Sequence, residues 1–321
     1  MTRPLVSVLM PAYNAEEFIK KSIQSILNQS YHYFELLIVD DCSNDDTYKL
    51  INEFNDPRIV ILKNNKNLGY LKSCNKLFEI CKGDYITFQD ADDWSHQFRI
   101  EKLLNVMLEN SNLGLCASRH SIVINNTSSD SVEISSPLNF LRGEIPFNFP
   151  CLGSSVMISK RALNDIGGYH PFFDRLGGED LEWISRVVDH FDSFVIDSVL
   201  YFYRYSTHSI TNKNYKLASI IMNEMLRYGI LKRRTSGINP FDEFLNKEIS
   251  WIINEMGLSN SRISELYRIR AAHDLDKKKV KEAYECLKES FRYKVFSVRN
   301  FQTLFYLIRV WFTCEFTRIT S

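Results

Sequence analysis

The first third of the chain alternates short apolar runs with segments whose apolar residues recur at helical spacing. The apolar runs predict strands over Leu5–Asn14, Phe34–Val39, 58–64 and 84–93. The segments between them predict helices over 15–29, 45–55 and 70–83, the last with Gly83 as its C-cap. Strands that are apolar on both faces and alternate with helices form a parallel sheet that helices cover. We therefore expect an α/β fold.

The pattern continues and then changes further along the chain. A helix is expected over Phe98–Glu109 and a strand over Leu113–Ile124, followed by a loop or insertion over 125–150. Residues 154–191 predict a strand, a short helix, a Gly-rich turn and a helix from about Glu179, and residues 193–211 predict a pair of strands. After residue 215 only helices are expected. The predicted domains are therefore an α/β domain over 1–215 and a helical region over 216–321.

Three carboxylates, Asp90, Asp92 and Asp93, end the fourth expected strand. Aspartate is common in turns and at helix N-caps, so one interpretation is a solvated turn, with Asp93 serving the following helix. Ligands of open α/β sheets, however, bind at the carboxyl ends of the strands. Magnesium usually binds through one or two carboxylates and the phosphates of a substrate, and a cation relieves the repulsion within such a cluster. The strand-end position favours a site for a metal and a diphosphate.

Other polar residues are expected at the same edge of the sheet. Asp40 and Asp41 end the second strand, where they either cap the next helix or accept a hydrogen bond from a base or a ribose. Asn67 and Gly69 lie in the loop that leads into the third helix, a weak signal because such turns are common.

A further acidic pair, Glu179 and Asp180, follows Gly177 and Gly178 and opens a helix. Acids are common in the first turn of a helix because they complement its dipole. The functional interpretation is that one of the two carboxylates acts as a general base.

Composition narrows the class of protein. The chain carries 39 basic and 39 acidic residues, so no basic excess points to nucleic acid. Its seven cysteines form no framework of close spacings, which favours reduced thiols in the cytoplasm. The N-terminal apolar run is too short for a secretory signal, and no stretch reaches the length of a transmembrane helix.

Three stretches together resemble family 2 glycosyltransferases, the inverting, nucleotide-sugar-dependent enzymes of the GT-A fold. They are Ser7–Thr47 with "MPAYN" and "VDDCSND", Asn65–Asp93 with "NLGY" and "QDADD", and Gly167–Val187 with "GGED". The resemblance covers roughly Leu5–Thr211. It implies a nucleotide-binding half over about 1–115, an acceptor-side half over about 116–215, and a mostly parallel sheet.

The resemblance also implies roles for individual residues, beginning with the donor side. The nucleotide pocket would be lined by Pro11, Ala12, Tyr13 and Asn14, with Glu16 nearby, and Asp40 or Asp41 would meet the base. The nucleotide or donor sugar would lie near Asn67, Gly69, Lys72 and Asn75. The DxD motif maps to Asp90-Ala91-Asp92, with Asp90 toward the ribose, Asp92 on a divalent metal (Mn²⁺ or Mg²⁺) and Asp93 beside the donor sugar.

On the acceptor side, the resemblance makes Asp180 the base that takes the proton of the acceptor hydroxyl. Gly178, Glu179 and Trp183 would contact the acceptor. Family members often carry a metal-binding His two residues after an Arg; here Ser206 holds that place and His208 follows it. His208 is either a second metal ligand or a surface histidine.

The C-terminal third lies outside the resemblance. From Arg292 onward it is rich in aromatic residues and carries five basic residues against Glu315, a net charge of 5 − 1 = +4. One interpretation is a helix that packs its aromatic side on the catalytic domain, and the other is an interfacial helix that binds anionic lipid.

The resulting prediction is an inverting hexosyltransferase of bacterial surface polysaccharide synthesis (capsule, O-antigen or lipooligosaccharide), at the inner face of the cell membrane. It moves a sugar from a nucleotide diphosphate, with a UDP-sugar favoured, to a glycan or lipid-linked glycan. Two alternatives are a nucleotidyltransferase and a non-catalytic nucleotide-sugar-binding protein. The first would need a basic, Gly-rich loop where "PAYNAEE" stands, and the second predicts loss of Asp92 or Asp180, both of which are present.

Overall fold

The structure is a computed structural model that describes residues 3–124, 127–128, 138–140, 151–205, 217–277 and 279–319. Contacts divide the chain into two units, Met1–Asn212 and Lys213–Ser321, and each is described by itself.

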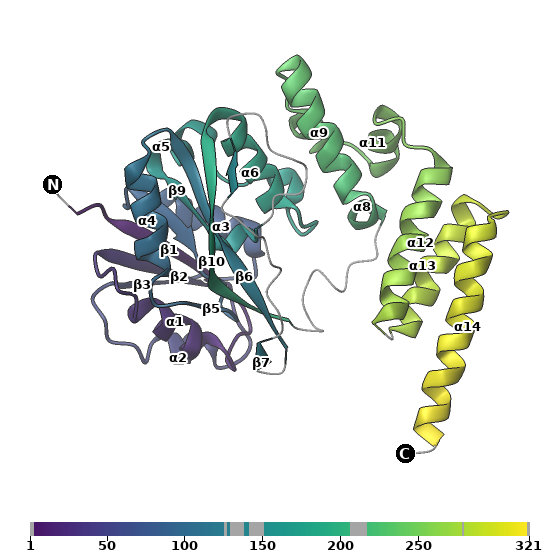
Figure 1. The fold of residues 1–321 in the computed structure, drawn as a ribbon, viewed down its shortest axis with the longest axis horizontal. Helices are drawn as coiled ribbons and strands as arrows, with labels where there is room; N and C mark the ends of the chain where they lie inside the picture. Colours follow the sequence, from purple (N-terminus) through teal and green to yellow (C-terminus); the bar gives the residue numbers. More distant parts are fainter. Residues whose placement is uncertain are drawn as a thin grey trace. The chain divides into compact units, whose positions relative to one another are not determined.

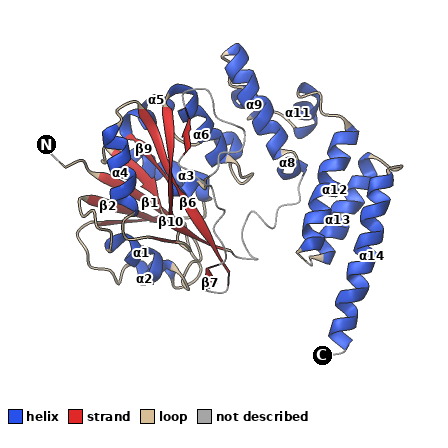
Figure 2. Cartoon of the chain, viewed as in Figure 1, coloured by secondary structure: helices blue, strands red, loops and turns tan. Residues whose placement is uncertain are grey.

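One sheet runs through the first unit (Figures 1 and 2). Its strands lie in the order β3 (Ile59–Lys63), β2 (Phe34–Asp40), β1 (Val6–Ala12), β4 (Tyr85–Phe88), β9 (Val156–Ser159), β6 (Leu113–Ile124), β10 (Asp192–Arg204) and β5 (Trp94–Ser95). Two short strands pair beside this row, β7 (Thr127–Ser128) with β6 and β8 (Leu138–Phe140) with β10.

The sheet is mixed in direction. Strands β3, β2, β1 and β4 are mutually parallel, as are β6 and β10, whereas β9 runs antiparallel to both of its neighbours. The predicted α/β fold is confirmed. The expected parallel arrangement is found in β3, β2, β1 and β4. The next strand in the sheet, β9, runs in the opposite direction, so the sheet as a whole is mixed.

Helices cover both faces of the sheet. The helices of the first unit are α1 (Ile19–Leu27), α2 (Thr47–Ile51), α3 (Tyr70–Ile80), α4 (Arg99–Glu109), α5 (Lys160–Ile166) and α6 (Glu179–His190), with 3-10 turns η1 (Gly153–Ser155) and η2 (Pro171–Phe173). On one face, residues of α1 and α4 share a core with Val8 and Met10 of β1. On the other face, Phe78 of α3 and Trp183 of α6 both contact the ring of Phe88 on β4.

Two local expectations differ from the structure, and one strand was missed. The third helix ends at Ile80, and Cys81 is already extended, so Gly83 is not its C-cap. Gly83 instead passes close to β1, since an added Cβ would lie 2.5 Å from the Ser7 backbone nitrogen. Where a pair of strands was expected over 193–211, the described residues form the single strand β10, which has a register shift between Ile196 and Val199, and residues 206–211 lie outside the described residues. The short strand β5 was not predicted.

In its described residues, the second unit contains helices and no strands. They are α8 (Leu217–Ile220), α9 (Met222–Ser236), α10 (Pro240–Phe244), α11 (Ile249–Glu255), α12 (Asn260–Asp276), α13 (Val280–Tyr293) and α14 (Val298–Ile319). Helices α12 and α13 bury apolar residues such as Tyr267 and Leu287, and α14 packs against both helices. None of the helices in the described residues combines the length and apolarity needed to cross a membrane.

Candidate active site

The carboxyl ends of β2, β1 and β4 lie side by side at one edge of the sheet. The last two residues of β1, Pro11 and Ala12, are buried, and Ala12 pairs with Asp40 of β2. Just after β4, the Gln89 nitrogen donates to the Leu9 carbonyl at 2.9 Å. This register brings together the turns that follow the three strands, where most of the predicted nucleotide-binding residues lie.

The turn after β1 is bonded to the turn after β2. Asn14, in a left-handed conformation with φ of 48°, accepts a hydrogen bond through Oδ1 from the Asn44 nitrogen at 2.8 Å. Glu16 accepts from the Asp46 nitrogen at 2.8 Å. The side chain of Tyr13 is exposed. Asn14 and Glu16 therefore hold the two turns together, and Tyr13 is the residue of this turn that presents a large surface to a ligand.

Asp41 anchors the loop after β3. Its carboxylate accepts from the Leu68 nitrogen, the Gly69 nitrogen and Asn64 Nδ2, each at 2.8 Å. The carboxylate is buried, and both of its oxygens are engaged. Gly69, with φ of 90°, is the N-cap of α3, so Asp41 fixes the start of that helix.

Asp40 keeps an oxygen that the described residues do not satisfy. Its Oδ2 accepts from the Ser43 nitrogen at 3.3 Å, whereas its buried Oδ1 has no hydrogen-bond partner there. Buried acceptors are normally satisfied, so an orphaned one at a ligand-binding edge marks a place for a donor. Of the two candidates for meeting the base, the geometry favours Asp40.

The loop from Asn67 to Lys72 is tied to the segment just before α6. Lys72 pairs with Asp174 at 2.5 Å, and Arg175 Nη2 donates to Asn67 Oδ1 at 2.9 Å. Lys72 and Arg175 are exposed, so both links are accessible to a competing anionic group. They join the predicted donor loop to the segment that leads into the predicted acceptor residues.

The side chain of Asn75 bonds the backbone of Tyr169. Its Nδ2 donates to the Tyr169 carbonyl at 2.9 Å, and its Oδ1 accepts from the Tyr169 nitrogen at 2.8 Å. Both ends of the amide are therefore used within the protein. Asn75 therefore supports the chain around Tyr169, and its place near the donor stays a prediction.

Asp90 and Asp92 form the accessible part of the acidic turn. Asp90 Oδ1 accepts from the Tyr70 hydroxyl at 3.1 Å, and the Asp90 nitrogen donates to the Tyr201 hydroxyl at 3.1 Å. Burial and the neighbouring charge of Asp92 raise the pKa of Asp90 to about 6. Burial also raises the pKa of Asp92. Ala91 between them is buried, so the two carboxylates flank an apolar residue.

Asp93 points into the protein. Its Oδ1 accepts from the Arg204 nitrogen on β10 at 2.7 Å, and its Oδ2 is buried without a partner in the described residues. Burial and the charge of Asp90 raise its pKa well above the ordinary range. Since α4 begins at Arg99, Asp93 does not cap that helix. We correct both expectations for Asp93, donor contact and cap, because it links the acidic turn to β10.

A buried arginine lies beneath the acidic turn. Arg99 donates to Ser95 Oγ at 2.8 Å, to Thr87 Oγ1 at 2.8 Å and to the Ser154 carbonyl at 2.7 Å. Burial lowers its pKa to about 10, while nearby charges, including Asp90, act in the opposite direction. A buried guanidinium offsets part of the repulsion among clustered carboxylates.

The second acidic pair opens α6. Gly177 and Gly178 both have positive φ, 84° and 83°, which other residues rarely adopt, and they turn the chain into the helix. Burial, then the charge of Asp180, raises the pKa of Glu179 to about 7, and burial raises that of Asp180. Asp180 also packs on Gly153 of η1, where an added Cβ would lie 2.5 Å from Asp180 Oδ2.

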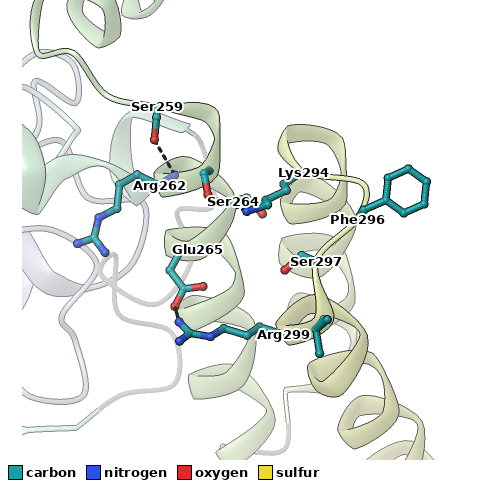
Figure 3. Close-up of a pocket in the computed structure, with 10 residues that line it drawn as sticks. Ser259, Arg262, Ser264, Glu265, Lys294, Phe296, Ser297 and Arg299 are labelled. Carbon is teal, nitrogen blue, oxygen red and sulfur yellow. Dashed lines mark hydrogen bonds and ion pairs between the residues drawn. The ribbon is translucent and has the colours of Figure 1, made fainter.

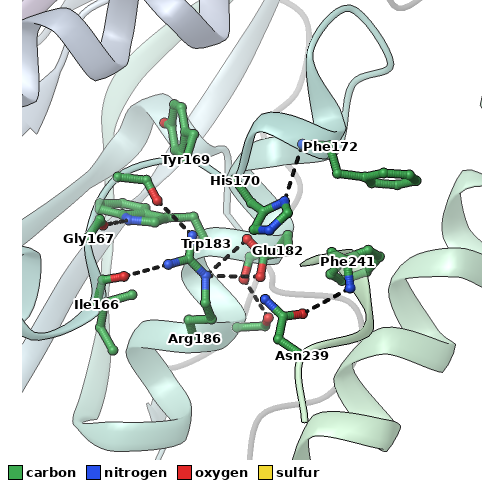
Figure 4. A network of polar contacts seen from close by, with 12 residues as sticks. Ile166, Gly167, Tyr169, His170, Phe172, Glu182, Trp183, Arg186, Asn239 and Phe241 are labelled. Atoms are coloured by element: carbon green, nitrogen blue, oxygen red, sulfur yellow. Dashed lines mark hydrogen bonds and ion pairs between the residues drawn. The ribbon is translucent and has the colours of Figure 1, made fainter. Parts of the chain in front are cut away.

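Helix α6 is locked onto the turn after α5 (Figure 4). Arg186 pairs with buried Glu182 at 2.9 Å and donates to the carbonyls of Ile166 at 2.6 Å and Gly168 at 2.7 Å. Trp183 is fully buried among aromatic rings and donates to the Gly167 carbonyl at 2.8 Å. Its expected contact with the acceptor was wrong, because its indole faces the core and fixes the helix.

Asp92 is the carboxylate best suited to a divalent ion. It is partly exposed, and among the described residues no other side chain bonds its carboxylate. Carboxylate oxygen is the ligand that Mg²⁺ and Mn²⁺ prefer, so the donor chemistry fits. The described residues contain no group of three His, Cys, Asp or Glu side chains that could hold a metal alone, and diphosphate oxygens would have to complete the shell. His208 lies outside the described residues.

Several residues of this site were not predicted from the sequence: Gly153, Arg99, Tyr70, Tyr201, Glu182 and Arg186. Arg99 and Tyr201 reach the acidic turn from segments with no local motif. The i,i+4 spacing of Glu182 and Arg186 is a recognisable signal of a helical ion pair, but it does not show that the pair is buried.

Such a fold, with carboxylates at the edge of a sheet and a helix-borne acid beside them, is that of a glycosyltransferase of the GT-A type. The chain belongs to glycosyl transferase family 2, whose model matches residues 7–166. TuaG of Bacillus subtilis, named for teichuronic acid biosynthesis, is 30% identical over 67% of this chain and 85% of its own length.

Two further relatives and a solved structure extend the comparison. The chain is 31% identical to the Escherichia coli UDP-Glc:α-D-GlcNAc-diphosphoundecaprenol β-1,3-glucosyltransferase WfgD over 66% of this chain and 81% of that relative. It is 42% identical to an uncharacterised Haemophilus influenzae glycosyltransferase over 34% of this chain, which spans 45% of that relative's length. The crystal structure of S. aureus TarS 1-349 with UDP-GlcNAc covers 91% of this chain and 93% of its own, with a TM-score of 0.58 and 16% identity, which supports the fold.

Proposed function

We propose that this glycosyltransferase moves a hexose from a UDP-sugar to a hydroxyl of a lipid-linked glycan in the synthesis of a bacterial surface polysaccharide, with inversion at the anomeric carbon. WfgD is named for a UDP-glucose donor and a diphosphoundecaprenol-linked acceptor, and TuaG for teichuronic acid biosynthesis. TarS was solved with UDP-GlcNAc. These names support the choice of donor and acceptor class.

The observation that carries the proposal is the environment of Asp180. Its carboxylate lies at the start of α6, and Asp180 contributes to the raised pKa of Asp90 across the site. A general base works best when its pKa is near the working pH, and burial moves the pKa of Asp180 in that direction. The lock formed by Glu182, Trp183 and Arg186 keeps α6, and with it this carboxylate, in place.

In the proposed reaction, Asp180 accepts the proton of the acceptor hydroxyl as that oxygen attacks the anomeric carbon. No second carboxylate acts as a nucleophile, so displacement is direct and the configuration inverts; inverting glycosidases follow the same opposite-face logic. Tyr13 and the orphaned Oδ1 of Asp40 face the nucleotide side. Asp92, with Asp90 beside it, would hold a divalent metal, which as a Lewis acid offsets charge on the leaving diphosphate.

We place the reaction in the cytoplasm. The cysteines in the described residues, such as Cys74 and Cys116, are all free thiols, a state typical of a reducing compartment. A lipid-linked acceptor would bring the enzyme to the inner face of the cell membrane as a peripheral protein.

The test compares Asp180→Asn with the control Asp165→Asn, an exposed acid at the end of α5. Wild-type protein is assayed with a panel of UDP-sugars, Mn²⁺ and a GlcNAc-diphosphoundecaprenol acceptor, and the anomeric configuration of the product is read by NMR. We expect inversion, and a loss of about 10²–10⁴-fold in kcat for Asp180→Asn alone, the typical contribution of a general base. The variant should keep its UDP-dependent thermal stabilisation. Retained turnover, or retention of configuration, contradicts the assignment.

A further inference from the structure

Helix α14 has an apolar face that the other described helices of the second unit leave largely exposed, with one contact between the rings of Phe301 and Phe291 of α13. Val298, Phe301, Phe305 and Ile308 follow one another at intervals of three, four and three residues, so they form one stripe along the helix. The Val298 side chain is 75% exposed and that of Phe305 is 70% exposed. An amphipathic helix normally turns polar residues toward solvent, so this stripe marks an interaction surface.

The orientation of α14 is fixed by polar contacts on its opposite side. Asn300 is buried, and its amide donates to Ser264 Oγ of α12 at 3.3 Å and accepts from Ser290 Oγ of α13 at 3.0 Å. Thr303 and Leu307 continue the buried side. A rotation that hid the apolar stripe would break these buried hydrogen bonds, so the stripe remains exposed in the folded helical unit.

The turn before α14 extends the apolar surface. Val295 is exposed and Phe296 is 89% exposed, and the phenyl ring of Phe296 projects away from the neighbouring helices (Figure 3). We call Val295, Phe296 and the four residues of the stripe the α14 apolar surface. Interfacial helices carry residues such as Phe, Trp and Leu on the face that enters the lipid.

The charged residues that the turn and α14 themselves carry, as far as Trp311, are all basic. The segment from Lys294 to Trp311 contains Lys294, Arg299 and Arg309 and no acidic residue. A hollow beside the turn is lined by four serines and three basic residues, with Glu265 as its one acid (Figure 3). Glu265 pairs with Arg299 at 3.3 Å and with Arg268 at 2.7 Å. Basic and hydroxyl groups beside exposed aromatic rings match the headgroups of an anionic membrane.

The same charges disfavour a second copy of this chain as the occupant. A twofold interface brings the same patch of both subunits together, so the basic residues Lys294, Arg299 and Arg309 of one subunit would face the equally basic patch of the other. Like charges in such an interface oppose association, whereas anionic lipid attracts each of them.

We propose that the α14 apolar surface docks the enzyme on an anionic lipid membrane, with Phe296 and the α14 stripe inserted among the lipids and the basic residues at the headgroups. The inference rests on the proposed function, since a lipid-linked acceptor requires the enzyme to work at a membrane. It identifies the contact as the outer side of α14 and the turn before it.

The experiment is flotation of the full-length protein with vesicles, with no substrate present. One set of vesicles is phosphatidylcholine alone, and the other contains about one third phosphatidylglycerol. We expect flotation with the anionic vesicles only, weakened by added salt. Phe296→Ser/Phe305→Ser should reduce the partition coefficient by about 10²-fold, roughly tenfold for each buried aromatic ring that is lost. Tyr284→Ser, which removes an exposed ring from α13, should bind as the wild type does.

Both aromatic residues are exposed, so the double variant should keep the wild-type melting temperature, which is measured alongside. Equal flotation with neutral vesicles, no flotation, or unchanged binding by the double variant overturns the inference. The inference is also overturned if the wild-type protein is a dimer, the double variant is a monomer, and the two proteins bind vesicles equally well. Asp180→Asn should float normally. If the wild-type protein does not bind vesicles but transfers sugar to a soluble acceptor, only this inference is contradicted. If it floats normally but transfers no sugar, the proposed function is contradicted.

Discussion

Gly153→Ala gives the sharpest test of the position of Asp180. A Cβ at residue 153 would lie 2.5 Å from Asp180 Oδ2 and 2.6 Å from Asp180 Cβ. Gly153 does not have a positive φ, so alanine brings no backbone strain and acts only through this contact. Ordinary contact between non-bonded heavy atoms requires about 3.5 Å, so Asp180 or η1 must move by about 1 Å.

A displacement of that size has separate consequences for stability and for rate. Overpacking a buried site costs about 1–3 kcal/mol of the free energy of unfolding. Misplacing a reacting group by about 1 Å costs about 10²-fold in rate, equivalent to about 2.7 kcal/mol of transition-state stabilisation. We therefore expect Gly153→Ala to lower kcat about 100-fold while the affinity for UDP changes little.

The assay measures kcat at saturating donor and acceptor, UDP affinity by calorimetry and stability by urea unfolding. Gly237→Ala is the stability control: it places alanine at a φ of 72°, with nothing near the added Cβ, in the second unit. It should lower stability and leave kcat unchanged. Combining Gly153→Ala with Asp180→Asn should add little to the loss caused by Asp180→Asn. A Gly153→Ala enzyme with kcat within about twofold of wild type would refute the reasoning, because the base would then tolerate displacement.

Three further outcomes follow from the charged groups. Arg186→Met leaves Glu182 buried without its cation, so the free energy of unfolding, measured in urea, should fall by about 3–5 kcal/mol. Adding Glu182→Gln should restore most of this loss. A loss below about 1 kcal/mol would show that the ion pair does not hold α6 in place. Arg99→Met removes a positive charge near Asp90, so the pKa of Asp90 should rise further above about 6. The acidic limb of the pH–rate profile should then move to higher pH. An unmoved limb argues against an electrostatic interaction between Arg99 and Asp90. The pKa of Glu179 is raised from 4.5 to about 7 in the folded protein. Between these two pH values the folded state therefore binds more protons than the unfolded state. The melting temperature of the ligand-free protein should fall as the pH rises through this range. Glu179→Gln should flatten that fall, and an equally steep fall in the variant would assign it to other groups.

The spacing of apolar residues along the chain predicted the positions of individual strands and helices. Strand β1 and helix α3 lie within the expected segments, and β2 extends only one residue beyond its expected end. Their apolar pattern is set by burial on both faces of the sheet or on one side of a helix. The reversed strand β9 was not predictable in this way, because strand direction depends on pairing between residues far apart in the chain. Burial of Trp183 has the same origin. The family resemblance implied that Trp183 contacts the acceptor, yet the rings of Phe78, Phe88 and Tyr169 enclose it.

The same distinction applies within the site. Sequence reasoning placed acids at the strand ends, but it could not separate those that serve the fold from those that remain for a ligand. Asp41 has both oxygens engaged by donors of the loop after β3, and Glu182 is neutralised by Arg186, so both are structural.

The remaining acids differ in how their burial is compensated. Asp90, Asp92, Glu179 and Asp180 are held in a partly buried site in which burial raises the pKa of each. A carboxylate whose charge is not compensated by the protein stabilises an incoming cation or proton more strongly than one already saturated with donors. In the proposed reaction, the cost of placing these four carboxylates together would be recovered when substrate binds, because a divalent ion at Asp90 and Asp92 and the proton taken up by Asp180 would relieve it. This argument predicts that replacing a saturated acid such as Asp41 damages folding first, whereas replacing Asp92 or Asp180 by the matching amide leaves stability unchanged or improved and removes activity.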